Sequence, residues 1–162
     1  MEKGKLTFED GSVYEGDIVN GKPHGKGERR WKGVYYEGDF FEGNFHGRGK
    51  SADSEGNLYE GDWFLGELHG YAKSRLDDGE AYEGFWFLGE YHFSGKNTLP
   101  DDSVYEGDFA VGLKHGKGKM TYPDGEVYEG DWFLGKPHGK GKMSYPDGKV
   151  EEGNWKEGEF VG

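Results

Sequence analysis

Histidine and carboxylate side chains are the groups in this 162-residue sequence that could bind a metal ion or act as general acids and bases. Every histidine lies ten residues after a tyrosine, so the histidines recur at one position of a repeating pattern. Catalytic and metal sites instead bring a few unlike groups together at one point. The histidines are His24, His46, His69, His92, His115 and His138.

The spacing of the histidines argues against a shared metal site. On a ladder of hairpins each repeat crosses two strands that lie about 4.8 Å apart, so neighbouring histidines would lie roughly 10 Å apart. That separation is too long for two of them to ligate one ion. We therefore expect turn histidines whose rings pack on a neighbouring side chain and hydrogen-bond to the backbone, and we expect no metal ion.

Other chemical motifs fit the sequence poorly. Residues 135–141 are rich in glycine and lysine, but the glycine spacing of a phosphate loop is absent and no helix can begin there. The Asp-Gly pairs lack the spaced aspartates and the distal glutamate of a calcium loop. The chain has no cysteine, which excludes disulfides, thiolate zinc sites and cysteine nucleophiles. We therefore predict a protein that has no cofactor and is not an enzyme.

The composition predicts a fold built from strands and turns. Glycine contributes 32 residues, and the longest segment without glycine, residues 96–106, contains Pro100. Each interior glycine costs a helix about 1 kcal/mol and each proline about 3 kcal/mol, so no segment could hold three stable helical turns. Full disorder is disfavoured because aromatic residues make up 17% of the chain.

A repeat of 23 residues organises the whole sequence. The tetrapeptide Tyr-Glu-Gly-Asp, or a close variant, recurs at intervals of 23 residues, except for 22 between the first two copies. A seventh copy at residues 151–154 lacks the tyrosine. The six complete copies begin at Tyr14, Tyr36, Tyr59, Tyr82, Tyr105 and Tyr128.

The sixth copy indicates that each repeat is a β-hairpin. We predict a first strand at about residues 128–134, a turn at residues 135–139 and a second strand at about residues 140–145. A Pro-Asp-Gly turn at residues 146–148 then leads into the next copy. Proline presets one turn dihedral angle and glycine accepts positive φ, so both breaks have a physical cause.

Alternation along the strands gives each hairpin two different faces. Tyr128 and Trp132 share one face of the first strand, whereas Glu129 and Asp131 share the other. The second strand adds lysines to the charged face, where pairs of opposite charge on neighbouring strands contribute roughly 0.2–1 kcal/mol each. We expect the glycines beside the rings to let aromatic side chains lie flat on the backbone.

The two ends of the chain continue the same pattern. Residues 1–13 match the second half of a repeat, residues 14–150 hold six repeats of 22 or 23 residues, and residues 151–162 supply a closing half repeat. The sequence therefore predicts a single all-β domain of about seven tandem β-hairpin repeats spanning residues 1–162.

The repeated motif resembles the MORN repeat family. The resemblance is carried by Tyr-Glu-Gly-Asp-Trp, then Gly, then Lys-x-His-Gly-x-Gly and Pro-Asp-Gly, on the 23-residue period, and it covers essentially the whole chain. It implies an elongated, twisted, single-layer antiparallel sheet with a groove lined by the repeated aromatic residues. It also implies a role in protein–protein scaffolding, in end-to-end or dimeric association, or in contact with phosphoinositides.

The aromatic columns are the predicted binding site. A single-layer sheet has no second layer to cover its apolar face, and this chain has no helix to supply one. Large exposed apolar surfaces mark interaction sites, at which Tyr and Trp are typical anchors. We therefore predict a scaffold or adaptor that binds a partner peptide or amphipathic helix in this groove. The predicted partner-binding residues are Tyr36, Tyr59, Trp63, Tyr82, Trp86, Tyr105, Phe109, Tyr128 and Trp132.

Other partners follow from the charge. A formal net charge of −12 argues against nucleic acid, because phosphate binding depends on Lys and Arg. The alternative function is a membrane-surface adaptor that recognises phosphoinositides or acidic phospholipids, which would require basic residues concentrated on one face. End-to-end homo-association is a further alternative. We expect a cytoplasmic protein, associated with the cytoskeleton or a membrane through a partner, because the N-terminus lacks an apolar signal core.

The fourth copy departs from the repeat. Phe85 replaces the acidic residue, Phe93 replaces the glycine after the histidine, and Asp102 replaces the glycine that precedes the next copy. These changes make the middle of the chain its most apolar part. They predict irregular turn geometry there.

Overall fold

The computed structural model describes all residues from Met1 to Gly162, and it contains strands and turns without helix. No helix is therefore present that could cross a membrane. The strands are β1 Glu2–Thr7, β2 Val13–Val19, β3 Lys22–Trp31, β4 Val34–Phe41, β5 Asn44–Ala52, β6 Leu58–Phe64, β7 Glu67–Arg75, β8 Ala81–Phe87, β9 Glu90–Thr98, β10 Val104–Ala110, β11 Leu113–Thr121, β12 Val127–Phe133, β13 Lys136–Ser144, β14 Val150–Lys156 and β15 Glu159–Phe160.

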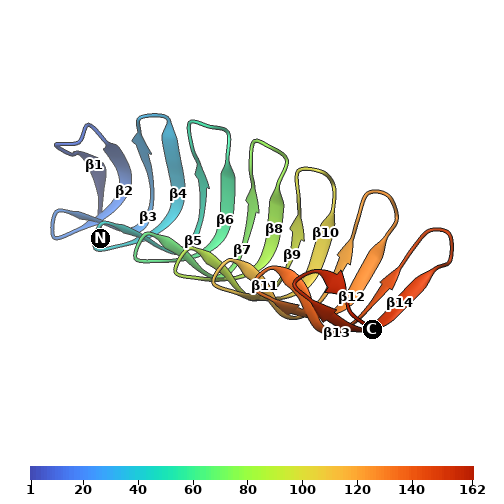
Figure 1. Ribbon diagram of the computed structural model, residues 1–162. Helices are drawn as coiled ribbons and strands as arrows, with labels where there is room; N and C mark the ends of the chain where they lie inside the picture. Colours follow the sequence, from blue (N-terminus) through green and yellow to red (C-terminus); the bar gives the residue numbers. More distant parts are fainter. The chain divides into compact units, whose positions relative to one another are not determined.

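The strands form one open antiparallel sheet in which strand order follows chain order, from β1 to β15 without a crossover. This confirms the predicted all-β fold of tandem hairpins in a single layer. The chain divides into two compact units, which we call unit 1 (Met1–Asp77 with Trp86–Gly89) and unit 2 (Asp78–Phe85 with Glu90–Gly162). Within each unit, hairpins lie side by side and their turns form a row at either end of the strands (Figure 1). The assignment of a single domain stays a prediction.

The hairpin turns are shorter than the sequence indicates. The sixth copy turns at Leu134 and Gly135, and β13 begins directly afterwards, so His138 lies in a strand rather than in a five-residue turn. Both turn residues have positive φ, 48° at Leu134 and 86° at Gly135. Such a two-residue turn matches the twist of the flanking strands. Leucine disfavours this conformation, at a cost of roughly 1–2 kcal/mol, so the residue pattern alone did not indicate a turn at Leu134.

Successive hairpin turns are joined by backbone hydrogen bonds. The amide of Gly66 donates to the carbonyl oxygen of Phe45 at 2.9 Å, and the amide of Gly89 donates to that of Leu68 at the same distance. The same bond recurs in unit 2, from Gly135 to Lys114. Each turn is thereby fixed on the preceding hairpin.

A β-bulge interrupts the pairing of the two strands in nearly every hairpin. In the sixth copy the pairing shifts between Gly130 and Trp132, where Asp131 alone lies opposite three residues of β13, residues 138–140. Its carboxylate accepts a hydrogen bond from the amide of Lys140 at 2.9 Å. Bulges bend strands and leave backbone groups unpaired. The aspartate at this position of the repeat thus supplies a hydrogen-bond acceptor for a backbone amide that the bulge leaves unpaired.

The bulge aspartate and the glycine after the histidine depend on each other. Gly139 has a φ of 107°, and a Cβ atom placed on it would lie 2.8 Å from the carboxylate of Asp131. Gly47 stands in the same relation to Asp39, with a φ of 64°. A side chain at this glycine would therefore collide with the aspartate as well as strain the backbone.

The fourth copy changes both of these positions together. Phe85 replaces the aspartate, so no carboxylate occupies the space beside residue 93, and Phe93 keeps the glycine-like conformation with a φ of 62°. Asp102 likewise keeps a positive φ of 71°. The predicted irregular turn geometry is therefore wrong. L-residues adopt the left-handed conformation here because the surrounding pairing is preserved.

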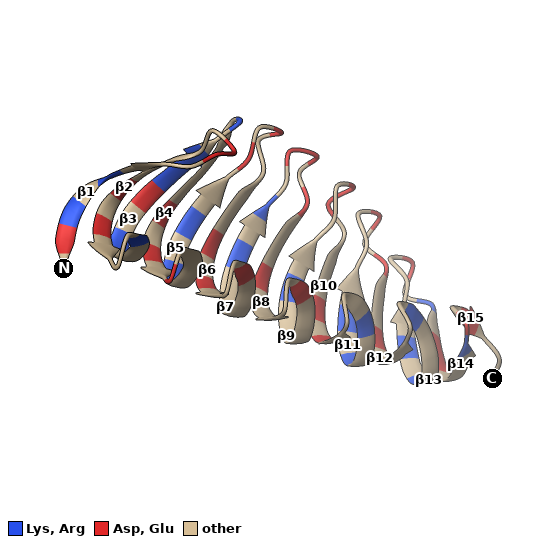
Figure 2. Cartoon of the chain, turned by 90° about the vertical axis from the view of Figure 1, so that its left-hand side faces the viewer, with Lys and Arg blue, Asp and Glu red and all other residues tan.

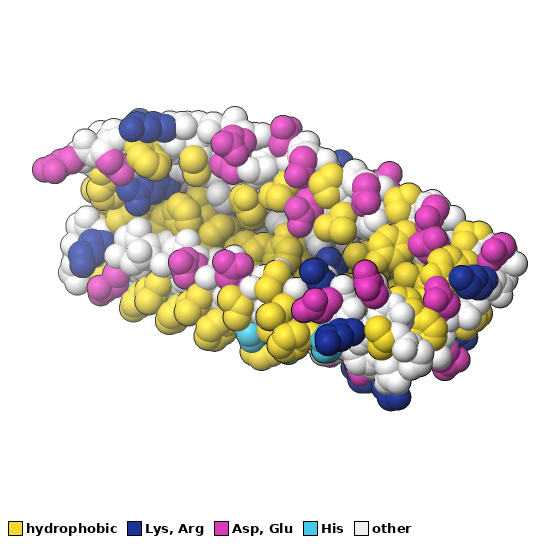
Figure 3. Space-filling model, in the orientation of Figure 1, with side chains coloured by type: hydrophobic (Ala, Val, Ile, Leu, Met, Phe, Trp, Pro, Cys, Tyr) yellow, Lys and Arg dark blue, Asp and Glu magenta, His cyan; other side chains and the backbone are white.

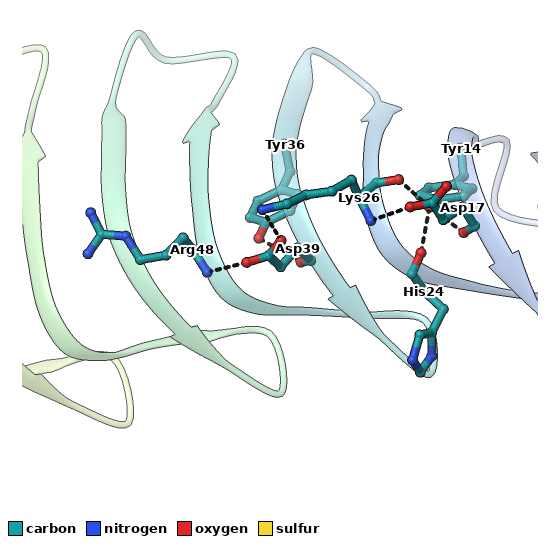
Figure 4. A network of polar contacts seen from close by, with 7 residues as sticks. All are labelled: Tyr14, Asp17, His24, Lys26, Tyr36, Asp39 and Arg48. Carbon is teal, nitrogen blue, oxygen red and sulfur yellow. Dashed lines mark hydrogen bonds and ion pairs between the residues drawn. The ribbon is translucent and has the colours of Figure 1, made fainter. Parts of the chain in front are cut away.

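Five of the six repeat tyrosines lie across a bare glycine. In the second copy a Cβ atom on Gly49 would overlap the phenol of Tyr36, whose ring is fully buried. The hydroxyl of Tyr36 donates to the bulge carbonyl oxygen of Asp39 at 2.9 Å (Figure 4). The sequence expectation that rings lie flat on glycine backbone is confirmed.

The third copy shows what happens when that glycine is absent. Ala72 occupies the position, opposite Gly61 in the β6–β7 pairing. Its tyrosine, Tyr59, is half-buried, whereas the other five repeat tyrosines are almost completely buried. Tyr59 also lacks the hydrogen bond to the bulge carbonyl that the others make. One methyl group thus displaces one ring.

We expect Gly49→Ala to destabilise the protein by about 2–4 kcal/mol, because it displaces Tyr36 and leaves the bulge carbonyl without its donor. The matched change Ala72→Gly should stabilise by about 1 kcal/mol, since it opens the space into which Tyr59 can fit. Urea unfolding measures both. Equal stability of wild type and Gly49→Ala would contradict the proposed role of the bare glycine.

We also expect Phe85→Asp and Phe93→Gly to be coupled. Phe85→Asp alone should destabilise, because the new carboxylate meets the side chain at position 93, whereas the double variant restores the arrangement of the other copies. A double-mutant cycle on unfolding free energies should give a coupling of about 1–2 kcal/mol. Additive effects would show that the two positions are independent.

Candidate functional site

The face of the sheet that carries the repeat tyrosines, which we call the inner face, holds two columns of interlocked rings. Tyr36 meets the edges of Phe40 and Trp63 with ring centroids 5.1 and 5.5 Å apart. Tyr128 lies between Trp132 and Trp155 in the same way, at 5.2 Å from each. Edge-to-face pairs of this kind stabilise beyond the area that they bury. The rings therefore form a continuous aromatic layer within each unit.

The tryptophans of the second column are anchored to the preceding hairpin. The indole Nε1 of Trp63 donates to the carbonyl oxygen of Gly49 at 3.0 Å, and that of Trp132 donates to Gly118 at 3.0 Å. Trp86 makes the same bond to Ala72 at 3.1 Å. These bonds fix the orientation of each ring and satisfy a backbone acceptor at the same time.

The predicted binding residues lie on the inner face, but their rings are largely closed off by one another. Only Tyr59 is half-buried, and the rest are at most 9% exposed. These rings cover one another, although the sheet is open and has a single layer. The buried residues are Tyr36, Trp63, Tyr82, Trp86, Tyr105, Phe109, Tyr128 and Trp132. Their participation in binding stays a prediction.

A third column, which the sequence analysis missed, covers the other two. Phe45 stacks on Tyr36 with centroids 3.8 Å apart and planes within 2°, and Tyr91 stacks on Tyr82 at 3.8 Å and 3°. The rings of Phe45 and Tyr91 are half-buried, so they form the accessible aromatic surface of the inner face. The signal was an apolar residue directly before most histidines. The column is Pro23, Phe45, Leu68, Tyr91, Lys114 and Pro137.

Hydrophobic side chains line a hollow on the inner face. Figure 3 shows this hollow over the hairpins of unit 1, between the row of hairpin turns and the row of Asp-Gly turns. The floor consists of the ring columns already described, with Phe45 and the buried Leu68 in its surface. The floor of the hollow therefore offers aromatic rings to an apolar chain segment.

Unit 2 places polar groups on the same face. Lys114 takes the third-column position, and its Nζ lies 5.7 Å from the ring centre of Tyr105 and 5.8 Å from that of Trp132. Burial lowers the pKa of this lysine, which Glu80 partly offsets. The carboxylate of Glu80 accepts hydrogen bonds from Tyr91 and Asn97, both at 3.2 Å. The inner face of unit 2 can therefore bind a charged group as well as apolar ones.

The opposite face, which we call the outer face, is charged. Glutamates and lysines face each other across the strands, as in the pair Glu37 and Lys50 (Figure 2). Arg48 lies 3.0 Å from Asp62, and Lys96 lies 3.8 Å from Glu106. An open depression of 610 Å³ on unit 1 is lined by such residues and the glycines between them. Exposed pairs of this kind contribute about 0–1 kcal/mol each.

The histidines have a structural role, as the sequence predicts. The imidazole of His69 packs against Phe64 and Phe87, and its Nδ1 accepts a hydrogen bond from the amide of Leu88 at 3.2 Å. His138 accepts the corresponding bond from Glu157. Acceptance at Nδ1 requires the neutral ring with its proton on Nε2. Each such histidine thus joins one hairpin to the turn of the next.

Comparison with known proteins agrees with this geometry. A family model described as MORN repeat matches residues 14–33, 36–57, 59–80, 105–127 and 128–150. The fourth copy, with its altered bulge and turn positions, falls between the matched segments. No curated protein sequence matches the chain.

A solved structure shares the fold. It is described as the SAS-4 (dCPAP) TCP domain in complex with a proline-rich motif of Ana2 (dSTIL) from Drosophila melanogaster. The TM-score is 0.50 at 15% sequence identity, and the alignment covers 95% of this chain and 90% of the TCP-domain chain. At this identity the likeness extends to the fold alone.

The buried tyrosines predict a loss of stability at alkaline pH. Burial raises the pKa of Tyr128 to about 12 and raises the pKa of Tyr105 as well. Unfolded tyrosines release their protons near pH 10, so the stabilising contribution is complete below that pH and falls as the pH rises toward about 12. Urea midpoints measured across this range, with absorbance of the phenolate, test the prediction.

Tyr128→Phe is the control for this alkaline effect. The variant loses one raised phenol, so its urea midpoint should fall less steeply with pH than that of the wild type. Phenolate absorbance that develops fully near pH 10 in the folded protein would contradict the burial argument.

Proposed function

The chain belongs to the MORN repeat family, and from this premise we propose that it is a non-enzymatic scaffold that binds a protein partner on the inner face of its sheet. The partner would be a peptide or an amphipathic helix. The half-buried rings of the third column would make the first contacts, and the buried columns beneath would hold those rings flat. The predicted residues from Tyr36 to Trp132 then act chiefly as the rigid support of the binding surface.

The observation that carries this proposal is an aromatic face without a covering layer. Phe45 and Tyr91 stack on tyrosines on one side and remain partly open to solvent on the other. Rigid aromatic side chains bind with little loss of conformational freedom, and Tyr and Trp dominate binding energy at protein interfaces. A preformed surface of this kind suits an apolar segment better than a small polar substrate.

The structural neighbour adds support for the class of partner. A TCP domain of the same fold is known with a proline-rich motif bound. This complex supports a peptide as the class of partner for the present chain.

Charge placement favours a protein partner over an acidic lipid surface. Basic side chains of the outer face already contact carboxylates, such as Lys26 with Asp39 and Arg48 with Asp62. A lipid-binding surface needs basic residues that concentrate on one face without such partners. His69 and His138 pack against neighbouring rings and accept backbone hydrogen bonds, which supports a role outside catalysis.

We expect truncation of the accessible inner rings to weaken partner binding. Peptides selected from a displayed random library on the wild-type protein serve as the probe. Phe45→Ala in unit 1 and Tyr91→Ala in unit 2 should each lower the affinity of a subset of these peptides by about tenfold or more, because each removes an anchor ring. Fluorescence anisotropy measures affinity, and circular dichroism checks the fold.

Phe133→Ala is the matched control, since it removes an aromatic ring that is 50% exposed on the outer face. It should leave the affinity of the selected peptides unchanged. Peptides that bind all three variants as tightly as the wild type would exclude the inner face as the binding surface.

A further inference from the structure

The outer face of unit 1 carries an apolar ridge along its hairpin turns. The ridge consists of Phe41, Phe64 and Phe87 at the ends of β4, β6 and β8, together with the turn residues Leu65 and Leu88. All five side chains are between 45% and 52% exposed. Figure 3 shows hydrophobic side chains, with histidine among them, along this lower edge of unit 1. We call these five residues the turn ridge.

The phenylalanines of the turn ridge are held in place by histidines. The rings of Phe41, His46 and Phe64 follow one another with centroids 5.4 Å apart at each step. His69 continues the column at 5.7 Å from Phe64 and 5.1 Å from Phe87. The next copy has Ala110 at the position of these phenylalanines. Three consecutive phenylalanines therefore occur only in unit 1.

The two leucines of the turn ridge are unfavourable for folding in two ways. Leu65 and Leu88 have φ values of 47° and 46°, a left-handed conformation that glycine and asparagine adopt far more readily. Half of each side chain is also exposed to water. The first copy has Asn20 at the equivalent position, with a φ of 51°. A residue that fits the turn better is thus present in the same chain, and stability alone does not explain leucine.

The charges around the turn ridge indicate what would cover it. Glu67 follows the turn of the third copy and has no cation within ion-pair distance, and Glu42 in the preceding turn has only an exposed pair with Lys22 at 3.7 Å. The chain as a whole carries a net charge of −12. A second copy of the chain and an anionic membrane are both repelled by this charge. A partner with basic residues beside its apolar ones is attracted.

We propose that the turn ridge is a second interaction surface, on the face opposite the aromatic hollow, and that it binds an amphipathic helix with apolar residues flanked by Lys or Arg. Adjacent ridge phenylalanines are two strands apart, or about 9.6 Å. Seven residues of a helix rise about 10.5 Å. A helix laid across the strands therefore places one apolar residue of each heptad between two successive ridge phenylalanines. The basic residues of the helix then lie beside Glu42 and Glu67.

The test uses a synthetic helix of about three heptads, with leucine at the ridge-facing position of each heptad and lysine at the flanking positions. Its affinity for the full chain is measured by fluorescence anisotropy. The double variant Leu65→Asn and Leu88→Asn should lower this affinity at least about tenfold. The same variant should unfold at an equal or higher temperature than the wild type, because asparagine suits the turn. Loss of folding therefore cannot account for a loss of binding.

Two control variants locate the effect. Leu134→Asn makes the same substitution at the equivalent turn of unit 2 and should leave the affinity for the lysine peptide unchanged. Phe45→Ala on the inner face should also leave it unchanged, so the turn ridge can fail or succeed independently of the inner-face proposal.

Several results would overturn the turn-ridge proposal. These are absence of binding by the wild type, equal binding by the ridge variant, and a loss of affinity in Phe45→Ala as large as in the ridge variant. Equal binding of a peptide with glutamate in place of lysine would overturn the charge complementarity. Sedimentation of the wild type as a dimer that the ridge variant loses, or ridge-dependent binding to phosphatidylserine vesicles, would assign the surface to another occupant.

Discussion

The close contact between a repeat tyrosine and a bare glycine, made in five of the six copies, is the interaction on which the rest of this structure depends. The ring can lie on the sheet only where the neighbouring strand has no side chain, and its hydroxyl then reaches the carbonyl of the β-bulge. In the copies that carry aspartate at the bulge, its carboxylate accepts a hydrogen bond from the exposed amide, as Asp131 does from Lys140. A single-layer sheet obtains a core in this way without a second layer, because the rings of successive hairpins cover one another.

The two faces of the sheet differ in how they use their side chains. The inner face uses almost all of its aromatic surface for cohesion, and only the third column, with Phe45 and Tyr91, remains partly accessible. The outer face combines ion pairs of small energetic effect with a row of exposed phenylalanines near the turns. The two surfaces that we propose for binding therefore consist of residues that the internal packing leaves partly exposed.

The fourth copy shows how tolerant the architecture is. Phe85 and Phe93 replace an aspartate and a glycine that depend on each other elsewhere, and β9 keeps a regular pairing with β10 although Phe93 has a left-handed conformation. In the third copy, a single methyl group at Ala72 is enough to displace Tyr59. Two changes that remain sterically compatible leave the strand pairing intact, whereas a single change at a close contact displaces the neighbouring side chain.

The sequence by itself determined the strands, the repeat and the order of the sheet. Glycine frequency excluded helices, the 23-residue period fixed the hairpins, and alternation assigned tyrosines and carboxylates to opposite faces. Histidine spacing also predicted its structural role. These features are local or periodic, so short-range rules capture them.

Only the tertiary structure decided which aromatic residues are accessible. The tyrosine and tryptophan columns were predicted as the lining of a groove, but contacts between neighbouring hairpins bury most of them and bring Phe45 and Tyr91 to the surface. The two-residue turns at leucine could not be predicted from the sequence either, because leucine disfavours the left-handed conformation. Strand pairing on both sides of the turn enforces that conformation. Burial and enforced backbone conformation are properties of the packed assembly of strands, which alternation along one strand does not contain.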